Sequence, residues 1–156
     1  MMNLIWILLL AMFSASAMAQ TQEETEAWII KQSGFNLEGR LKHSIEGDEL
    51  ISRLTLPYAM GGETIQRSIP IKQIKTISYT HTAAYLSYTL MCDKPCTTQF
   101  NGNTEVEEKS PKFLFEIHKS LDSGFPPRMN EALLKLVELH SGKARMARQQ
   151  TQKEAF

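Results

Sequence analysis

The two cysteines, Cys92 and Cys96, are the residues whose type and spacing most directly suggest chemistry. They are the only cysteines in the 156 residues, and Asp93-Lys94-Pro95 separates them. Two thiols this close could form a disulfide, act as a redox pair or contribute to a metal site. Redox enzymes favour C-x-x-C at the start of a helix, and zinc needs about four ligands. The spacing therefore favours a structural disulfide, with a redox pair and a metal site as the alternatives.

The first nineteen residues indicate the compartment in which these cysteines would lie. Residues 4–13 form an unbroken apolar run, no charged residue occurs in 1–19, and the segment ends Ala17-Met18-Ala19. A short apolar core before an A-x-A-like site is typical of a secretory signal peptide, although no Lys or Arg precedes this core. We expect cleavage after Ala19 and a periplasmic or secreted protein; an uncleaved anchor or a buried helix is the alternative. An oxidising compartment favours disulfide formation.

The residues around the cysteines predict the local structure that would hold them. Residues 85–92 and 96–100 both have strand composition, and Asp-Lys-Pro is turn chemistry. Cysteines on either side of a tight hairpin can face each other at the Cβ separation of about 3.8 Å that a disulfide needs. The sequence therefore predicts a hairpin whose two strands are joined by a short-range disulfide.

Histidine, serine and glycine patterns offer no catalytic motif. The four histidines fall on separate predicted elements: His43, His81, His118 and His140. None has a partner four residues away, as a metal-binding helix would require, so we assign each a structural or surface role. The Ser-Gly pairs lack the surrounding G-x-S-x-G of a nucleophile elbow. Gly61-Gly62 is too short for a phosphate-binding loop.

Two clusters could bind a ligand but have simpler explanations. Glu105, Glu107 and Glu108 could hold a calcium ion, yet acidic runs are usually solvated, and we expect an exposed loop over 101–110. Tyrosines could line a pocket, but at strand spacing they are more often core residues: Tyr79, Tyr85 and Tyr88.

Charge and length limit the classes of function. Seventeen basic residues balance seventeen acidic ones, which argues against nucleic acid or an anionic membrane as the main partner. Residues 20–142 have the size of one domain. We expect residues 143–156 to be a polar C-terminal tail and the mature chain not to insert stably into a membrane.

Periodicity predicts a helix, a series of strands and a second helix. Thr21 and Glu24 form a capping box for a first helix that ends near Gly34. Strands are predicted at 35–45, 50–56, 65–71, 74–80, 85–92, 96–100 and 112–118. A final helix over 127–141 carries an apolar stripe, with Pro126-Pro127 at its start and Gly142 as its C-cap.

This order predicts an α+β fold: a seven-stranded antiparallel bent sheet or partly open barrel, with the last helix closing one end. The chain resembles small secreted bacterial proteins of pleckstrin-homology-like (PH-like) fold. The resemblance lies in Glu24 and Trp28 of the leading helix, Ile-Pro-Ile-x-x-Ile at 69–74, the cysteine hairpin, and Arg-Met-x-x-Ala-Leu-x-x-Leu at 128–136. It implies a fold and no established activity. Phosphoinositide binding is not carried over to an exported protein, and the loops show no basic cradle.

The function predicted from these observations is an exported, non-enzymatic binding module with a protein partner and no cofactor or metal. A small-ligand carrier is one alternative, although the inward faces of the strands look mostly apolar. A thiol-redox protein using Cys92 and Cys96 is the other.

Overall fold

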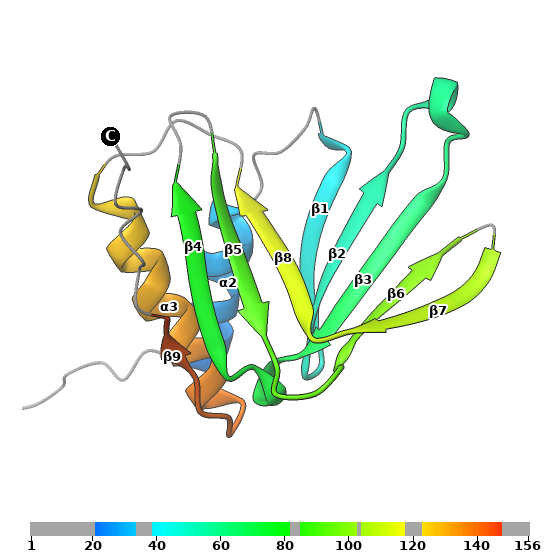
Figure 1. Ribbon diagram of the computed structural model, residues 1–156. Helices are drawn as coiled ribbons and strands as arrows, with labels where there is room; N and C mark the ends of the chain where they lie inside the picture. The colour runs from blue at the N-terminus through cyan, green and yellow to red at the C-terminus, as the bar shows by residue number, and fades with distance from the viewer. Residues whose placement is uncertain (1–20, 34–38, 82–84, 103, 118–122, 148–156) are drawn as a thin grey trace, which may run out of the picture.

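A computed structural model describes residues 21–33, 39–81, 85–102, 104–117 and 123–147. It is an α+β structure with two mostly antiparallel sheets and two α-helices, and the described strands do not form a closed barrel (Figure 1). The five-stranded sheet has the order β1 (Leu41–Glu46), β2 (Glu49–Thr55), β3 (Thr64–Pro70), β6 (Thr97–Asn101) and β7 (Thr104–Ser110). The four-stranded sheet has the order β8 (Lys112–Ile117), β5 (Leu86–Met91), β4 (Thr76–His81) and β9 (Arg145–Met146). The helices are α2 (Gln22–Gln32) and α3 (Phe125–Leu139), and the 3-10 turns are η2 (Tyr58–Met60) and η3 (Ile71–Gln73).

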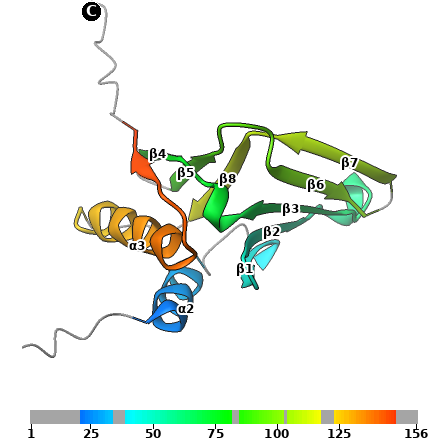
Figure 2. The ribbon, with the colours of Figure 1, turned by 90° about the horizontal axis from the view of Figure 1, so that it is seen from below.

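Three connections carry the chain from one sheet to the other at a single corner. β3 continues through η3 into β4, β5 continues into β6, and β7 continues through Pro111 into β8. Each of these three chain segments therefore contributes one strand to each sheet. Figures 1 and 2 show the five-stranded sheet extending from this corner away from the helices. Pro70 lies at one of the bends, as its missing N–H would suggest.

The two helices lie together against one face of the four-stranded sheet (Figure 2). The main core forms between them, that face, and the corner end of the five-stranded sheet. On β8 the predicted inward residues Phe113, Phe115 and Ile117 are all buried, which confirms the alternation of that strand.

α2 begins with the capping box that the sequence predicts. The Thr21 hydroxyl accepts a hydrogen bond from the Glu24 N–H, and the Glu24 carboxylate accepts one from the Thr21 N–H. Thr25 and Ile29 are the fully buried residues of this helix, and the ring of Trp28 lies 6.3 Å from that of Phe125 in α3. The capping box fixes where the helix starts, and these residues fix which face meets the core.

α3 confirms the predicted apolar stripe at Met129, Leu133 and Leu136, but Ala132 and Leu139 are only partly buried, and the helix begins two residues earlier, at Phe125. Its buried residues are Phe125, Pro126, Met129, Leu133, Leu136 and Val137. Gly142 is not its C-cap. The cap is His140, and the left-handed residue after it is Ser141, with φ 61°. Gly142 instead sits where a Cβ would lie 2.7 Å from Val137 Cγ1 and 2.9 Å from Lys72 Cα.

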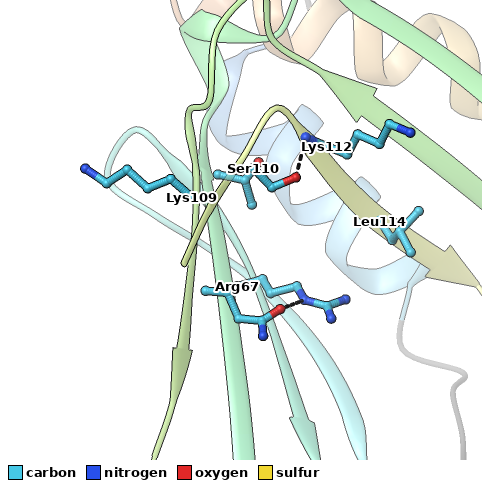
Figure 3. A pocket seen from close by; sticks show the side chains of 7 residues that line it. Arg67, Lys109, Ser110, Lys112 and Leu114 are labelled. Atoms are coloured by element: carbon cyan, nitrogen blue, oxygen red, sulfur yellow. Dashed lines mark hydrogen bonds between the residues drawn. The ribbon is translucent and has the colours of Figure 1, made fainter. Parts of the chain in front are cut away.

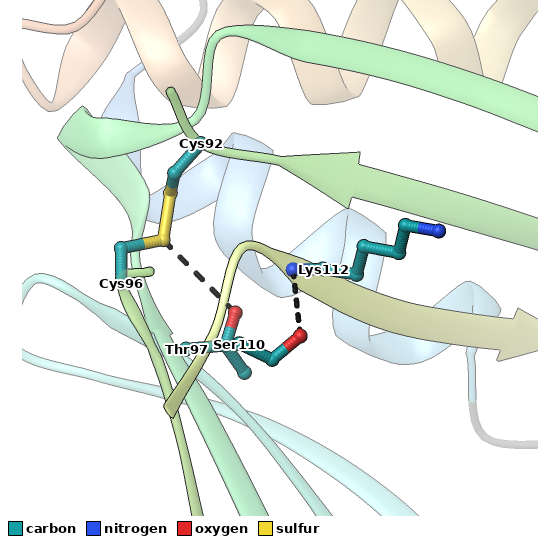
Figure 4. Close-up of a disulfide and its surroundings, with 5 residues drawn as sticks. All are labelled: Cys92, Cys96, Thr97, Ser110 and Lys112. Atoms are coloured by element: carbon teal, nitrogen blue, oxygen red, sulfur yellow. Dashed lines mark hydrogen bonds between the residues drawn. A yellow bond between two sulfur atoms is a disulfide. The ribbon is translucent and has the colours of Figure 1, made fainter. Parts of the chain in front are cut away.

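The cysteine hairpin predicted from the sequence is wrong, although the two residues are joined. Cys92 and Cys96 form a disulfide with their Cα atoms 6.2 Å apart (Figure 4). The strands on either side, β5 and β6, belong to different sheets and do not pair with each other. Cys92 N–H instead donates to Pro111 O and Cys96 N–H to Ser110 O. The disulfide therefore closes the crossover between the two sheets, and the two backbone hydrogen bonds hold that crossover against the neighbouring bend between β7 and β8.

Three further expectations differ from the structure. The predicted loop over 101–110 contains β7, because an edge strand needs a backbone partner on one side only and polar composition does not prevent this. The count of seven strands is not confirmed, since the described residues form nine. The first part of the predicted tail belongs to the fold: Arg145–Met146 pairs in parallel with β4, and Ala144 packs on the core. Pairing with the open edge of β4 orders this polar segment.

Candidate functional site

A groove runs between the five-stranded sheet and β8, the edge strand of the four-stranded sheet. Its wider part, about 330 Å³, is lined by Arg67, Thr97, Gln99, Lys109, Ser110, Lys112 and Leu114. A narrower part of about 60 Å³ is lined by Leu41, Ser52, Leu54, Ile65, Arg67, Leu114 and Glu116. Arg67 and Leu114 border both parts. We call the two together the inter-sheet groove.

A row of polar side chains crosses the middle of the groove floor. His43 on β1 is opposite Ser52 on β2, Ser52 is opposite Arg67 on β3, and Arg67 is opposite Gln99 on β6. Residues opposite each other in antiparallel strands point to the same face. His43 and Ser52 are only 8% and 7% exposed. The expectation that the inward faces of the strands are mostly apolar is therefore wrong for this row of residues.

Arg67 is the central charge of this row. Its Nε donates to Gln99 Oε1 at 2.6 Å, which fixes the plane of the guanidinium (Figure 3). In Figure 3 the side chains of Arg67 and Lys112 extend toward the side on which Leu114 lies, whereas Lys109 extends the opposite way. Among the described residues, neither Arg67 nor Lys112 has an ion pair with a carboxylate. The described side chains that line the wider part of the groove therefore include basic residues and no acidic one.

β8 forms the opposite wall of the groove. Phe113 and Phe115 face the core and pair with β5, whereas Leu114 is 42% exposed and borders the groove. The Lys112 N–H binds Ser110 and the Glu116 carbonyl binds His43, so both point away from β5, and the period of two along the strand gives the N–H and C=O of Leu114 the same direction. At the start of β8, the Lys112 N–H donates to the Ser110 hydroxyl at 3.1 Å (Figure 4). The groove is therefore bordered by a strand edge as well as by side chains.

His43 bridges the groove floor to this edge. Its Nε2 lies 3.1 Å from the carbonyl oxygen of Glu116 on β8, and its ring centre is 4.5 Å from that of Phe115. A carbonyl can only accept, so Nε2 carries the proton of this hydrogen bond. His43 has a structural role, as the sequence suggests, and sets how far β1 and β8 separate.

His140 is also structural. It is buried, with Nε2 2.8 Å from Glu26 Oε1 and Nδ1 3.0 Å from Asp48 Oδ1. Both contacts are hydrogen bonds when the imidazole carries both of its protons. The ring thereby ties the end of α3 to α2 and to the turn between β1 and β2. Of the other histidines, His81 ends β4 and His118 lies outside the described residues.

Tyr79 and Tyr88 belong to the core rather than to the groove. Tyr88 is fully buried, and its hydroxyl donates to Asn130 Oδ1 on α3 at 2.8 Å. Its ring lies 5.5 Å from that of Tyr79. Burial, with a smaller contribution from Tyr79, raises the pKa of Tyr88 above its ordinary value. This confirms the interpretation of Tyr79 and Tyr88 as core and cross-strand residues.

The remaining sequence candidates do not meet in one site. Cys92 and Cys96 lie at the corner, where Cys96 precedes the groove residue Thr97. The three glutamates lie on β7, but the structure does not describe their side chains. Within the described ranges, no group of three or more His, Cys, Asp or Glu residues could hold a metal ion.

Sequence reasoning missed the inter-sheet groove, although one signal was present. Arg67 alternates with Ile65 and Ile69, which places a charge on an otherwise apolar strand face. Gln99, the residue that orients it, is 32 positions away in the sequence. Only the pairing of β3 with β6 brings the two together.

Comparison with protein families, with curated proteins and with solved structures found no significant match. None of the helices in the described part of the chain combines the length and the apolar character needed to cross a bilayer.

Proposed function

We propose that this chain is an exported, non-enzymatic binding module and that the inter-sheet groove receives a protein partner. The observation that carries the proposal is the groove itself, with Arg67 held by Gln99 at its centre and the edge of β8 along one side. Oriented polar groups in a solvent-open groove provide specificity without a reaction. A partly open sheet covered by helices is compatible with the PH-like fold, which we retain as part of the proposal.

Export is supported by the signal-like segment at 1–19 and by the Cys92–Cys96 disulfide. Mass spectrometry of the protein isolated from cells should show a chain beginning at Gln20. Recovery of the intact chain from membranes would contradict export with cleavage.

A small-ligand carrier is the second candidate. The wider part of the groove, about 330 Å³, is at the lower end of the range for small-molecule sites. Its polar floor provides the groups that the apolar pattern of the sequence did not suggest. A carrier isolated from its own compartment should release a small molecule on denaturation, and a protein-binding module should not.

The test of the leading proposal is to fill the groove without disturbing the core. Leu114→Trp adds bulk at a groove residue that is 42% exposed, and Phe100→Trp adds it at a residue that is 43% exposed on the other face of the five-stranded sheet. Immobilised mature protein should capture its partner from the exported fraction of the same cells as wild type and as Phe100→Trp, but not as Leu114→Trp. Equal capture by all three folded proteins would place binding outside the groove.

A further inference from the structure

Two arginines on neighbouring strands have the same anchor but different surroundings. Arg53, on the outer face of the five-stranded sheet, donates from Nε to Gln66 Oε1 at 2.9 Å. Its remaining N–H groups bind Glu46, with Nη1 2.8 Å from Oε1, and this bond lowers the pKa of that carboxyl. The guanidinium is thus held by an amide on one edge and occupied by a carboxylate on the other.

Arg67 repeats the first half of this arrangement in the groove. Its Nε binds Gln99 Oε1, but the described residues place no carboxylate at its remaining N–H groups. Lys112 lines the same part of the groove. A fixed planar guanidinium whose two Nη groups have no described partner matches the two oxygens of a carboxylate. A carboxylate is therefore the ligand group that fits the remaining N–H groups of Arg67.

The wall beside Arg67 favours an extended peptide as the carrier of that carboxylate. The backbone N–H and C=O of Leu114 point from β8 into the groove, where an added strand residue would form a pair of hydrogen bonds with them. On one side, the Glu116 carbonyl is already bound by His43, and on the other the Lys112 N–H is bound by Ser110. Between these two bound groups, the N–H and C=O of Leu114 are the backbone pair on this edge to which a short strand could bond.

The rest of the groove limits the sequence of such a strand. Beyond Arg67 the lining is largely apolar, with Leu41, Leu54 and Ile65, and the volume is about 60 Å³. This part suits a small apolar side chain. Glu116 lies at the same end and would repel a second acid there. The acidic residue should therefore lie at the Lys112 end of the groove.

We infer that the inter-sheet groove binds an extended acidic segment of a protein partner, which pairs with the edge of β8 at Leu114 and places one carboxylate on Arg67 and Lys112. This inference rests on the proposed function and specifies the partner segment that the groove would take.

The test uses two blocked pentapeptides, acetyl-Thr-Val-Asp-Val-Thr-amide and its Asn analogue, titrated into the ¹⁵N-labelled mature protein. The Asp peptide should shift the amide signals of Gln99 and Leu114 and bind about tenfold or more tightly than the Asn peptide, since a charged hydrogen-bonded pair is lost in the analogue. Equal binding of the two peptides, or no shift in the groove, would overturn the inference.

Substitutions separate the two contacts. Arg67→Gln should abolish the preference for Asp over Asn, and Lys112→Gln should reduce it, whereas Arg53→Gln, with the same change in net charge, should leave it intact. Leu114→Pro removes the groove-facing N–H without removing a bond to β5, so it should weaken both peptides equally; Leu114→Ala keeps that N–H and should weaken them less. Full discrimination retained by a folded Arg67→Gln protein, as judged by its melting curve, would contradict the carboxylate contact.

Two results distinguish this inference from the proposed function. Loss of partner capture in Leu114→Trp but not in Arg67→Gln would keep the groove as the binding site and reject the acidic segment. Inorganic phosphate that displaces the Asp peptide at lower concentration than acetate does would assign Arg67 to a phosphate ligand instead and would overturn the inference.

Discussion

His43 on β1 donates a hydrogen bond to the Glu116 carbonyl of β8, 3.1 Å away, across a seam that no strand ladder closes. The two strands are edges of different sheets, and in a closed barrel they would pair through their backbones. Here a side chain makes the link, and the floor of the inter-sheet groove begins beside it at Ser52. The hydrogen bond and the ring contact of His43 thus link these two edge strands while leaving the groove open.

His43→Ala should lower the free energy of unfolding by about 1–3 kcal/mol, because it removes the hydrogen bond to Glu116 and the ring contact with Phe115. His43→Phe, which keeps an aromatic ring, should lose less. Lys42→Ala, at the exposed neighbouring position, is the control and should change little. Urea unfolding measures all three; a His43→Ala protein as stable as Lys42→Ala would remove the seam contact from this account.

Gly142→Ala should destabilise by about 1–3 kcal/mol through overpacking, because the new Cβ would lie 2.9 Å from the backbone of Lys72. Ser141→Gly should have the opposite sign or no effect, since Ser141 adopts φ 61° at a cost that glycine avoids. Thermal melting of the two variants gives the comparison. If Gly142→Ala were neutral, the close approach of the α3 end to η3 would be wrong.

Leu136→Ala should cost about 2–5 kcal/mol, because Leu136 is buried between α3 and the four-stranded sheet. Lys135→Ala, one residue away, removes only an exposed pair with Glu138 and should cost less than about 1 kcal/mol. Chemical denaturation distinguishes these values easily. Similar losses from both substitutions would contradict the stripe on α3.

Replacing Cys92 and Cys96 together by serine should cost about 2 kcal/mol or less, because the disulfide closes a very short loop. The measurement is the urea midpoint of the double variant against that of the oxidised wild type. Partner capture should persist at temperatures where the variant is folded. Loss of capture from a fully folded double variant would instead favour the thiol-redox alternative.

The elements of this fold could be predicted from the sequence where one side is buried along a regular element. The stripe on α3, the alternation of Phe113 and Phe115 on β8, and the capping box at Thr21 all depend on neighbours within a few residues. Burial of one face leaves a periodic pattern, and such a pattern is readable in a single sequence.

The arrangement of the strands could not be predicted in the same way. Asp93-Lys94-Pro95 would suit a hairpin turn, but β5 and β6 pair with other strands, and the same residues serve a crossover between sheets. Turn chemistry limits the local conformation and does not choose the partner of each strand. Arg67 is part of a site only because β3 pairs with β6, which places Gln99 beside it.

Placing a photo-crosslinking amino acid at single positions, and irradiating the cells that produce the protein, tests whether the inter-sheet groove is the binding site. Leu114 in the groove and Phe100 on the outer face are equally exposed apolar positions, at 42% and 43%. Binding in the inter-sheet groove predicts a discrete crosslinked partner from position 114 and none from position 100. A partner crosslinked from position 100 and not from 114 would contradict it.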